Sequence, residues 1–205
     1  MRLGLMLAAG EATRMPNKPF LPIDADGTTA IGTGIAFLGR WCEHTCVVTR
    51  ANSLVKPVLG MLGYEAIYVE QIYPGVTGAI ASAVAVGDWN EVLVAFCDNV
   101  YSPKEQIARD RNSWPTVSVR ERASAQLDGW DGSQWVSRNV ITRRKIAGWL
   151  LLDIEDIMTA RSHNSLVKFL NAINAKPHEC SLPWHDIGTE ESYLDYIAVQ
   201  GQPTP

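Results

Sequence analysis

The chain begins with a short apolar stretch, LGLMLAAG (residues 3–10), on which the interpretation of the fold depends. Its first part is apolar enough for a strand that is buried on both faces, and its last three residues are small enough for a tight loop. A secretory signal peptide has a similar outline, with Arg2 before an apolar run. Here the run only reaches the lower length limit of such a segment and continues directly into Glu11 and Arg14. A buried first strand therefore explains it better.

Similar apolar runs recur along the first hundred residues, and helix-like segments separate them. This alternation is typical of successive βαβ units and favours an α/β fold, with a Rossmann-like, mostly parallel central sheet that is flanked by helices. The predicted strands lie at residues 3–7, 45–49, 66–69 and 92–96, and the predicted helices at residues 29–38, 53–61 and 77–86.

The second half of the chain follows a different pattern. A capping box with Pro at the first helical position, Ser102-Pro103-Lys104-Glu105, predicts a helix. Residues 116–119 alternate like a strand, and a turn at residues 128–132 predicts a small β-hairpin insertion with residues 134–136. A strand at 146–152 and helices at 154–160 and 165–173 follow. A last helix is expected from Glu190, with Thr189 as its cap.

The composition is that of a folded globular domain. The chain has 205 residues, of which 46% are hydrophobic, and 18 Lys and Arg against 22 Asp and Glu give a formal net charge of −4. This length predicts one domain over residues 1–205. The slightly acidic balance argues against nucleic acid as a partner, and no apolar run approaches the length that would span a membrane. The sequence leaves the oligomeric state open, a homo-oligomer included.

The four cysteines have no spacing that indicates a disulfide framework, which favours reduced thiols in an intracellular, cytoplasmic protein. A zinc site could be assembled from Cys42, His44 and Cys46 with His178 and Cys180. However, this spacing matches no standard ligand pattern, so we favour small buried thiols.

The loop after the first strand suits an anionic ligand. Its small residues, 8–10, let backbone amides approach a phosphate closely, and Arg14 and Lys18 add positive charge. The loop has neither the Walker spacing nor the glycines of a dinucleotide fingerprint. On this local pattern alone, a tight turn beside two solvated cations explains the loop equally well.

Two carboxylates, Asp98 and Asp186, each end an apolar segment. Magnesium takes carboxylate oxygens and keeps positions open for substrate phosphates, so two such aspartates in one cleft would suit a nucleotide-bound metal. A turn or a helix cap is the alternative explanation for each residue alone.

Taken together, these motifs resemble the sugar-1-phosphate nucleotidyltransferases. The resemblance runs from residue 3 to about residue 198, and its motifs occur in the family's order. They are Leu7-Ala8-Ala9-Gly10 with Arg14-Met15 and Asn17-Lys18-Pro19, then Gln71 with Gly75-Val76-Thr77-Gly78-Ala79, then Cys97-Asp98-Asn99, and finally Trp184-His185-Asp186-Ile187-Gly188-Thr189.

The resemblance implies a role for each matching position. Arg14, Lys18 and Asp98 would be catalytic: Arg14 would steady the departing pyrophosphate, and Lys18 would contact the phosphates. Asp98 and Asp186 would hold Mg²⁺. Gln71 would read the edge of the nucleobase. The remaining nucleotide-binding residues would be Leu7, Ala8, Ala9, Gly10, Gly75, Thr77 and Gly78.

The implied reaction joins the nucleoside monophosphate of a nucleoside triphosphate to a sugar-1-phosphate and releases pyrophosphate. A phosphate monoester is already a nucleophile, so positioning and charge neutralisation suffice. Two alternatives remain: a cytidylyltransferase for a small phospho-alcohol such as phosphocholine, and a non-catalytic nucleotide-binding module. A metal-dependent glycosyltransferase is disfavoured because Asp98-Asn99-Val100 lacks a second acid.

The chain departs from the family's pattern at three places. Glu11-Ala12 replaces a second glycine in the first loop, and Cys97 replaces the glycine before the metal aspartate. The Glu-Lys-Pro segment that grips the sugar phosphate is not recognisable. We expect Arg143, or another member of the basic cluster Arg138, Arg143, Arg144 and Lys145, to take that role, and a solvated basic face is an equally good explanation.

Overall fold

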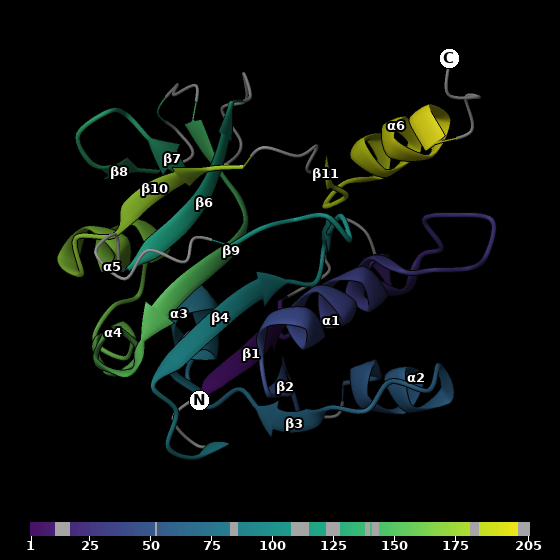
Figure 1. Cartoon of the computed structure of the whole chain (residues 1–205), viewed down its shortest axis with the longest axis horizontal. Coiled ribbons are helices and arrows are strands. Elements are labelled where there is room, and N and C mark those ends of the chain that lie inside the picture. The colour runs from purple at the N-terminus through teal and green to yellow at the C-terminus, as the bar shows by residue number, and fades with distance from the viewer. Residues whose placement is uncertain are drawn as a thin grey trace.

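A computed structural model gives the structure of the chain and describes residues 1–10, 17–51, 53–82, 86–107, 115–121, 128–137, 140, 144–180 and 185–200. Its centre is a β-sheet with the strand order β10-β6-β9-β4-β1-β2-β3, and helices cover both faces (Figure 1). The expected mixed α/β fold, with a mostly parallel sheet between helices, is confirmed. No helix in the described ranges is both long and apolar enough to cross a membrane.

The first four strands pair in parallel around β1, which lies between β2 and β4. Leu7, at the end of β1, is opposite Val48 on one side and Phe96 on the other. The carboxyl ends of these strands therefore meet at one edge of the sheet. The strands are β1 (Arg2–Leu7), β2 (His44–Thr49), β3 (Ile67–Glu70) and β4 (Glu91–Phe96), close to the predicted bounds.

A long antiparallel strand, β9 (Arg144–Asp153), joins this group to the rest of the sheet. It pairs with β4 on one side and β6 (Thr116–Glu121) on the other, and Leu150 is opposite both Val94 and Val117. The predicted hairpin is confirmed as β7 (Gly129–Trp130) and β8 (Trp135–Val136). The edge strand β10 (Lys176–Glu179), parallel to β6, has no counterpart in the sequence prediction.

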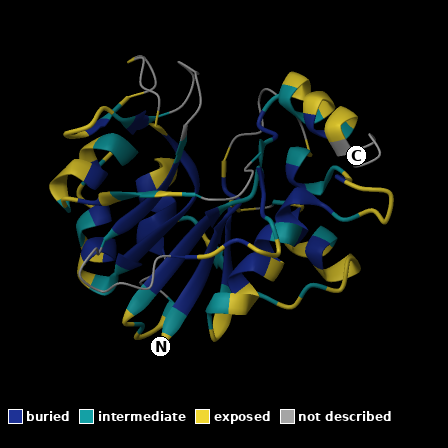
Figure 2. Ribbon diagram, turned by 45° about the horizontal axis from the view of Figure 1, so that its top comes forward, coloured by how far each residue is buried: buried dark blue, intermediate teal, exposed yellow. Residues whose placement is uncertain are grey.

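Two hydrophobic clusters, one on each face, hold the helices against the sheet. Helices α1 (Ala30–Trp41) and α2 (Val55–Met61) bury Leu38 and Leu59 in one cluster. Helices α3 (Gly75–Ala81), α4 (Ile154–Ala160) and α5 (Leu166–Ala172) pack against the other. Figure 2 shows the resulting buried sheet between helices with exposed outer faces. Predicted helices are confirmed at all five places, although α3 ends before the predicted residue 86.

The helix expected at Ser102 is wrong. Residues 103–104 form a turn and residues 105–107 have no regular secondary structure, and the Glu105 N–H donates to the Ser102 carbonyl oxygen at 3.0 Å. In a capping box the Glu105 carboxylate would reach back to the Ser102 N–H. Instead it is buried and accepts a hydrogen bond from Trp149 Nε1 at 3.4 Å. Burial against β9 has overridden a local helix signal.

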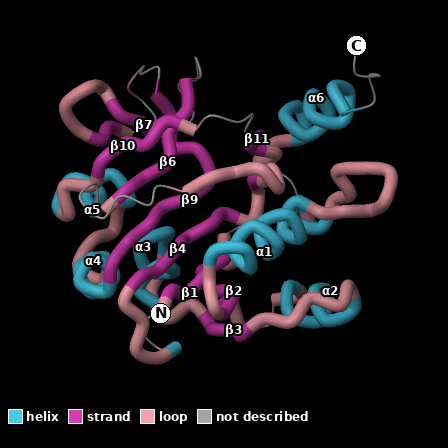
Figure 3. The backbone as a smooth tube through the Cα atoms, viewed as in Figure 1, coloured by secondary structure: helices cyan, strands magenta, loops and turns pink. Residues whose placement is uncertain are grey.

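The last segment returns to the carboxyl edge of β4. There β11 (His185–Asp186) pairs antiparallel with β5 (Asn99–Val100), and α6 (Glu190–Gln200) follows directly (Figure 3). Thr189 caps α6 as predicted, because its Oγ1 accepts from the Ser192 N–H at 3.2 Å. A short 3-10 turn, η1 (Lys18–Phe20), lies before α1 in the chain.

Candidate functional site

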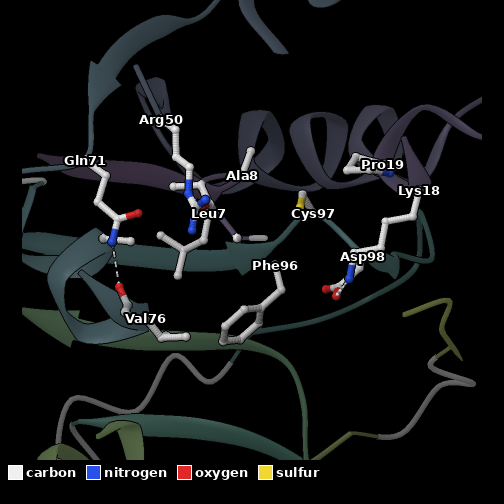
Figure 4. A pocket seen from close by; sticks show the side chains of 14 residues that line it. Leu7, Ala8, Lys18, Pro19, Arg50, Gln71, Val76, Phe96, Cys97 and Asp98 are labelled. Carbon is white, nitrogen blue, oxygen red and sulfur yellow. Dashed lines mark hydrogen bonds and ion pairs between the residues drawn. The ribbon is translucent and has the colours of Figure 1, made fainter. Parts of the chain in front are cut away.

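A pocket of about 400 Å³ opens at the carboxyl ends of the parallel strands (Figure 4). In open α/β sheets, ligands bind at this edge. Apolar and small residues form much of its wall, and polar side chains stand at both ends. The lining residues are Leu7, Ala8, Ala9, Gly10, Lys18, Pro19, Arg50, Gln71, Gly75, Val76, Ala79, Phe96, Cys97 and Asp98.

An ion pair marks one end of the pocket. Lys18, at the start of η1, and Asp98, directly after β4, approach to 2.6 Å between Nζ and Oδ2. Both side chains are mostly buried, at 15% and 28% exposure. Lys18 can reach Asp98 because Asn17 adopts a left-handed conformation, φ 60°, which turns the chain into η1. The structure therefore brings together two residues that are 80 positions apart in sequence.

The second aspartate, Asp186, lies beside the first. The pairing of β11 with β5 sets Asp186 opposite Asn99, and the Ile187 N–H donates to the Asp98 carbonyl oxygen at 2.9 Å. A Cβ placed on Gly188 would be 2.7 Å from Asp186 Oδ1 and 3.6 Å from Asp98 Oδ2. Both carboxylates thus border the same small space, which only a glycine leaves open.

This pair of carboxylates suits a hard divalent cation that completes its coordination with substrate phosphates and water. Throughout the described ranges, no group of three or more His, Cys, Asp or Glu side chains could hold a metal ion. In particular, Cys46 and Cys42 belong to opposite faces of the sheet, so they do not assemble the zinc site considered from the sequence. The residues present therefore fit a metal ion that is coordinated partly by a phosphate ligand. They do not fit a metal ion that is coordinated by protein side chains alone.

Gln71 stands at the other end of the pocket. Its Nε2 donates to the carbonyl oxygens of Tyr73 and, at 2.8 Å, Gly75. Gly75 has a φ of +79°, a conformation that other residues adopt only with strain, and this orients the loop in which both carbonyls lie. The Gln71 amide is therefore held in one orientation, with its oxygen toward the pocket (Figure 4).

The backbone of the first loop is only partly available to a ligand. Ala8, Ala9 and Gly10 line the pocket as predicted, but the Ala8 N–H continues the β1–β2 ladder and donates to the Val48 carbonyl oxygen at 2.9 Å. The Ala9 carbonyl oxygen accepts from Arg50 Nε at 2.6 Å. Arg14, for which the sequence predicts a contact with the pyrophosphate, lies outside the described residues.

Arg50 is a pocket residue that sequence reasoning missed. It follows β2 directly, so its position at the carboxyl end of a parallel strand was the available signal. Cys97, also in the lining, adds no charge, because burial raises the pKa of its thiol to about 12.

Two of the predicted nucleotide-binding residues lie outside the pocket lining. Thr77 is buried in α3, where its Oγ1 donates to the His163 carbonyl oxygen at 2.6 Å. Gly78 is also buried, and its missing side chain lets Tyr73 pack closely against α3. Both residues support the segment that carries Gln71 and Gly75.

The two described members of the basic cluster, Arg144 and Lys145, lie at the start of β9 and do not line the pocket. Arg144 pairs with Glu179 at 2.9 Å, and both side chains are about half exposed. Lys145 is fully buried, and burial lowers the pKa of its ammonium, although the charge of Asp128 opposes this effect. Arg138 and Arg143 lie outside the described residues.

His185 packs edge to face on Tyr196, with 4.8 Å between ring centroids.

Comparisons with known proteins agree with this geometry. The model of the MobA-like NTP transferase domain matches residues 4–128. No curated protein sequence matches the chain significantly. Among solved structures, a protein described as a putative glucose-1-phosphate thymidylyltransferase from Bacillus anthracis superposes with a TM-score of 0.81 at 16% identity, covering 100% of this chain and 97% of that one.

Two further structures show the same fold. The inositol-1-phosphate CTP transferase from T. maritima has a TM-score of 0.73 at 16% identity, over 100% of this chain and 98% of that one. UDP-glucose pyrophosphorylase from Acinetobacter baumannii has a TM-score of 0.73 at 13% identity, over 98% of this chain and 93% of that one. The resemblance to nucleotidyltransferases is confirmed: this chain belongs to the MobA-like NTP transferase domain family.

Proposed function

We propose that this protein is a single-domain enzyme that transfers a nucleoside monophosphate from a nucleoside triphosphate to a sugar-1-phosphate and releases pyrophosphate. One observation carries the proposal. The pocket connects an end with the Gln71 amide and the Arg50 guanidinium to an end where Lys18 and Asp98 pair at 2.6 Å and Asp186 lies nearby. A nucleotide also has two unlike ends, a base that carries hydrogen-bonding groups and phosphates that bind cations and metal ions.

In this proposal the base lies at Gln71 and the phosphates extend along residues 8–10 toward Lys18. An oxygen of the sugar-1-phosphate forms a bond to the α-phosphorus, and the bond from that phosphorus to the bridging oxygen breaks. Pyrophosphate leaves with the electron pair of the broken bond. Lys18 neutralises charge on the α-phosphate during this step, and Arg14 is proposed to hold the pyrophosphate. The monoester needs no base to activate it.

Asp98 and Asp186 are proposed to hold Mg²⁺. When bound, the ion would neutralise phosphate charge and bring the two reacting phosphates together. The Lys18 ammonium would then be released from Asp98 Oδ2 and be available to the substrate. Both carboxylates border the space left open at Gly188, so a side chain at that position would block the site.

The acceptor is the less defined part of the reaction. Arg143 is proposed to bind the phosphate of the sugar. A small phospho-alcohol would present the same nucleophilic phosphate, and the similar fold of the inositol-1-phosphate CTP transferase keeps this class in consideration. The retained Lys18–Asp98 pair argues against a binding module without turnover, because nucleotide binding alone does not require a carboxylate beside Lys18.

The test is a matrix of nucleotides and acceptors. The protein is incubated with magnesium, one of five triphosphates (ATP, GTP, CTP, UTP or dTTP), and either a sugar-1-phosphate or phosphocholine, and pyrophosphate is measured. We expect release that requires both substrates. Release with phosphocholine but with no sugar-1-phosphate would establish the cytidylyltransferase alternative. Nucleotide binding without release in any combination would establish the binding module and refute the enzyme.

A further inference from the structure

The hydroxyl of Tyr101 lies between two strands at the point where their pairing stops. Strands β4 and β9 pair as far as Ala95 and Trp149, and the same register would next set Phe96 opposite Gly148. Instead, the Phe96 N–H donates to Tyr101 Oη at 2.8 Å, and Tyr101 Oη donates to the Gly148 carbonyl oxygen. The hydroxyl therefore takes the place of a direct hydrogen bond between the two strands.

Strand β9 is bent at the residue that accepts this bond. Gly148 has a φ of +98°, a conformation that residues with side chains rarely adopt. The register between β6 and β9 shifts between Val117 and Val119, as at a β-bulge. Between them, Ser118 Oγ accepts from the Trp149 N–H at 2.9 Å and donates to the Trp149 carbonyl oxygen at 2.8 Å. Two buried hydroxyls, one from each neighbouring side, thus satisfy the backbone of β9 at this bend.

Helix α1 fixes Tyr101 in place. The ring stacks on Phe37 with 4.8 Å between centroids and 17° between planes, and the Tyr101 N–H donates to Thr33 Oγ1 at 3.1 Å. A Cβ placed on Gly34 would be 3.2 Å from Tyr101 Cε2, so the helix backbone comes close to the ring. Burial raises the pKa of the Tyr101 phenol well above its ordinary value, so the hydroxyl keeps the proton that it donates to β9.

The placement of Asp98 depends on this arrangement. Residues 97–98 form the turn between β4 and β5, and Tyr101 directly follows β5. Because Tyr101 bonds back to Phe96, the last residue before the turn, it fixes the two ends of the turn relative to each other. The carboxylate of Asp98 is thereby directed away from β9 to Lys18, at 2.6 Å.

We propose that Tyr101 is a positioning residue for the metal site proposed above. Its hydroxyl keeps the end of β4 apart from β9, and this sets the Asp98 carboxylate where it pairs with Lys18 and borders the same space as Asp186. The inference rests on the proposed function, because it takes Asp98 to be a metal ligand. Tyr101 does not line the pocket, so it acts through Asp98 and not on the substrate.

The first test needs neither metal nor turnover. Tyr101→Phe removes the hydroxyl and keeps the aromatic ring. The Phe96 N–H and the Gly148 carbonyl oxygen then lose the partner that they share, which costs free energy unless the end of β4 moves. In a crystal structure of the variant, we expect β4 to shift at this end and the Lys18–Asp98 contact to open beyond about 4 Å, the longest separation of an ion pair.

The second test separates positioning from general support of the fold. In Tyr101→Phe, the magnesium concentration for half-maximal pyrophosphate release should rise about 10- to 100-fold, while nucleotide affinity measured without metal should change less than about threefold. Ser118→Ala is the matched control, because it also removes a buried hydroxyl that bonds to the backbone of β9. It should lower the free energy of unfolding, measured in urea, and leave the magnesium requirement unchanged.

Thr33→Val is a second variant that leaves the Tyr101 hydroxyl in place. It removes the acceptor of the Tyr101 N–H and keeps the volume of the side chain. We expect a smaller change in the same direction, with the magnesium requirement raised about 3- to 10-fold. If Tyr101→Phe does not fold, Thr33→Val decides, and a magnesium requirement equal to that of the wild type would overturn the inference.

The remaining outcomes distinguish the inference from the proposed function. If Tyr101→Phe keeps the Lys18–Asp98 contact at its present length, the inference is wrong and the proposed reaction is unaffected. An opened contact with an unchanged magnesium requirement would also overturn it, and so would an equal rise in Ser118→Ala. If the contact opens but the wild type releases no pyrophosphate with any acceptor, the proposed reaction fails, while the placement of Asp98 by Tyr101 stands.

Discussion

The two halves of the sheet are built differently and contribute differently to the site. In the N-terminal half, residues 1–98, parallel strands are joined by nearby helices, and, among the residues that the structure describes, all those that line the pocket come from this half. In the C-terminal half, residues 115–200, the long strand β9 runs antiparallel between β4 and β6. Within the described residues, this half contributes Asp186, which lies beside Asp98.

This difference indicates a division of labour. Successive βαβ units place their carboxyl ends at one edge, so a nucleotide pocket can form from a continuous stretch of chain. In the C-terminal half, a long stretch of chain precedes Asp186. The pairing of β11 with β5 then places Asp186 next to Asp98. Nucleotide binding should therefore depend on the N-terminal half alone, whereas transfer should depend on both.

The largest expected effect comes from Asp98, where the halves meet. We expect Asp98→Asn to lower kcat/KM for pyrophosphate release by a factor on the order of 10² to 10³, because it removes the negative charge that pairs with Lys18 and that is proposed to hold Mg²⁺. The exposed Asp88 provides the control, since Asp88→Asn should retain wild-type turnover. Near-normal rates in Asp98→Asn with an unchanged circular dichroism spectrum would contradict the assignment.

Asp186 tests the division of labour directly. Asp186→Asn should reduce turnover by roughly 10²-fold. Its affinity for nucleotide, measured without magnesium, should stay within about twofold of the wild type because Asp186 does not line the pocket. In the wild type, the Gly188 N–H donates a hydrogen bond to Asp186 Oδ1 at 2.7 Å. The Asn side chain keeps an oxygen that can accept this bond. A large loss of metal-free nucleotide affinity would show that the C-terminal half takes part in nucleotide binding.

The sequence predicts the N-terminal half well because its signals are local. The parallel strands β1, β2 and β4 are short apolar runs that are mostly buried, and the residues that follow them, such as Asp98, reach the site by the register of the sheet. Arg50 was missed because a charged residue after a strand is also typical of a solvated turn. Only the β2–β3 pairing shows that it faces Gln71's end of the pocket.

The C-terminal half was harder to predict because its elements depend on distant partners. The Ser102 helix was wrong since Glu105 is used in the contact with Trp149 on β9. Strand β10 was missed because Lys-Pro-His-Glu has no apolar alternation, and as an edge strand with one neighbour it needs none. That Asp186 lies beside Asp98 follows from the β5–β11 pairing, which no local pattern indicates.

A buried carboxyl in the C-terminal half should make that half sensitive to pH. Burial raises the pKa of Asp156, in the first turn of α4, from 3.8 to about 6. The native state therefore binds more protons than the unfolded state between about pH 4 and 6, and stability falls as the pH rises through this window. Relative to wild type, Asp156→Asn should gain on the order of 2 kcal/mol between pH 4 and 7.

Urea unfolding at several pH values measures this gain. Asn can still accept the hydrogen bond that the Asp153 N–H donates to Asp156 Oδ2 at 3.1 Å, so the cap of α4 should be retained. Glu155→Gln, at an exposed position of the same turn, is the control and should show no such window. A difference between Asp156→Asn and wild type that stays constant with pH would refute the buried-acid explanation.

In the N-terminal half, two glycines give opposite predictions. Gly75→Ala should lower the free energy of unfolding by about 1–2 kcal/mol, because φ is +79° there, and should weaken nucleotide binding by freeing Gln71. Gly60 lies at an exposed site in α2, and no atom lies within 4 Å of the Cβ that an alanine would add. Gly60→Ala should therefore raise the free energy of unfolding by about 0.5–1 kcal/mol. Chemical denaturation measures both, and changes of the same sign would contradict the role of the backbone at Gly75.

The smallest expected effect concerns the helix that follows Asp186. Thr189 Oγ1 accepts from the Ser192 N–H, and the Thr189 N–H donates to Ser192 Oγ at 3.1 Å, so each residue satisfies the other's backbone. Thr189→Ala should cost about 1 kcal/mol of stability, and Thr189→Ser, which keeps the hydroxyl, should cost much less. Because α6 begins shortly after β11, the strand that carries Asp186, loosening this cap should raise the magnesium concentration needed for half-maximal turnover. The same loosening should leave metal-free nucleotide affinity unchanged, and a loss of that affinity in Thr189→Ala would mean that the two halves are not separable.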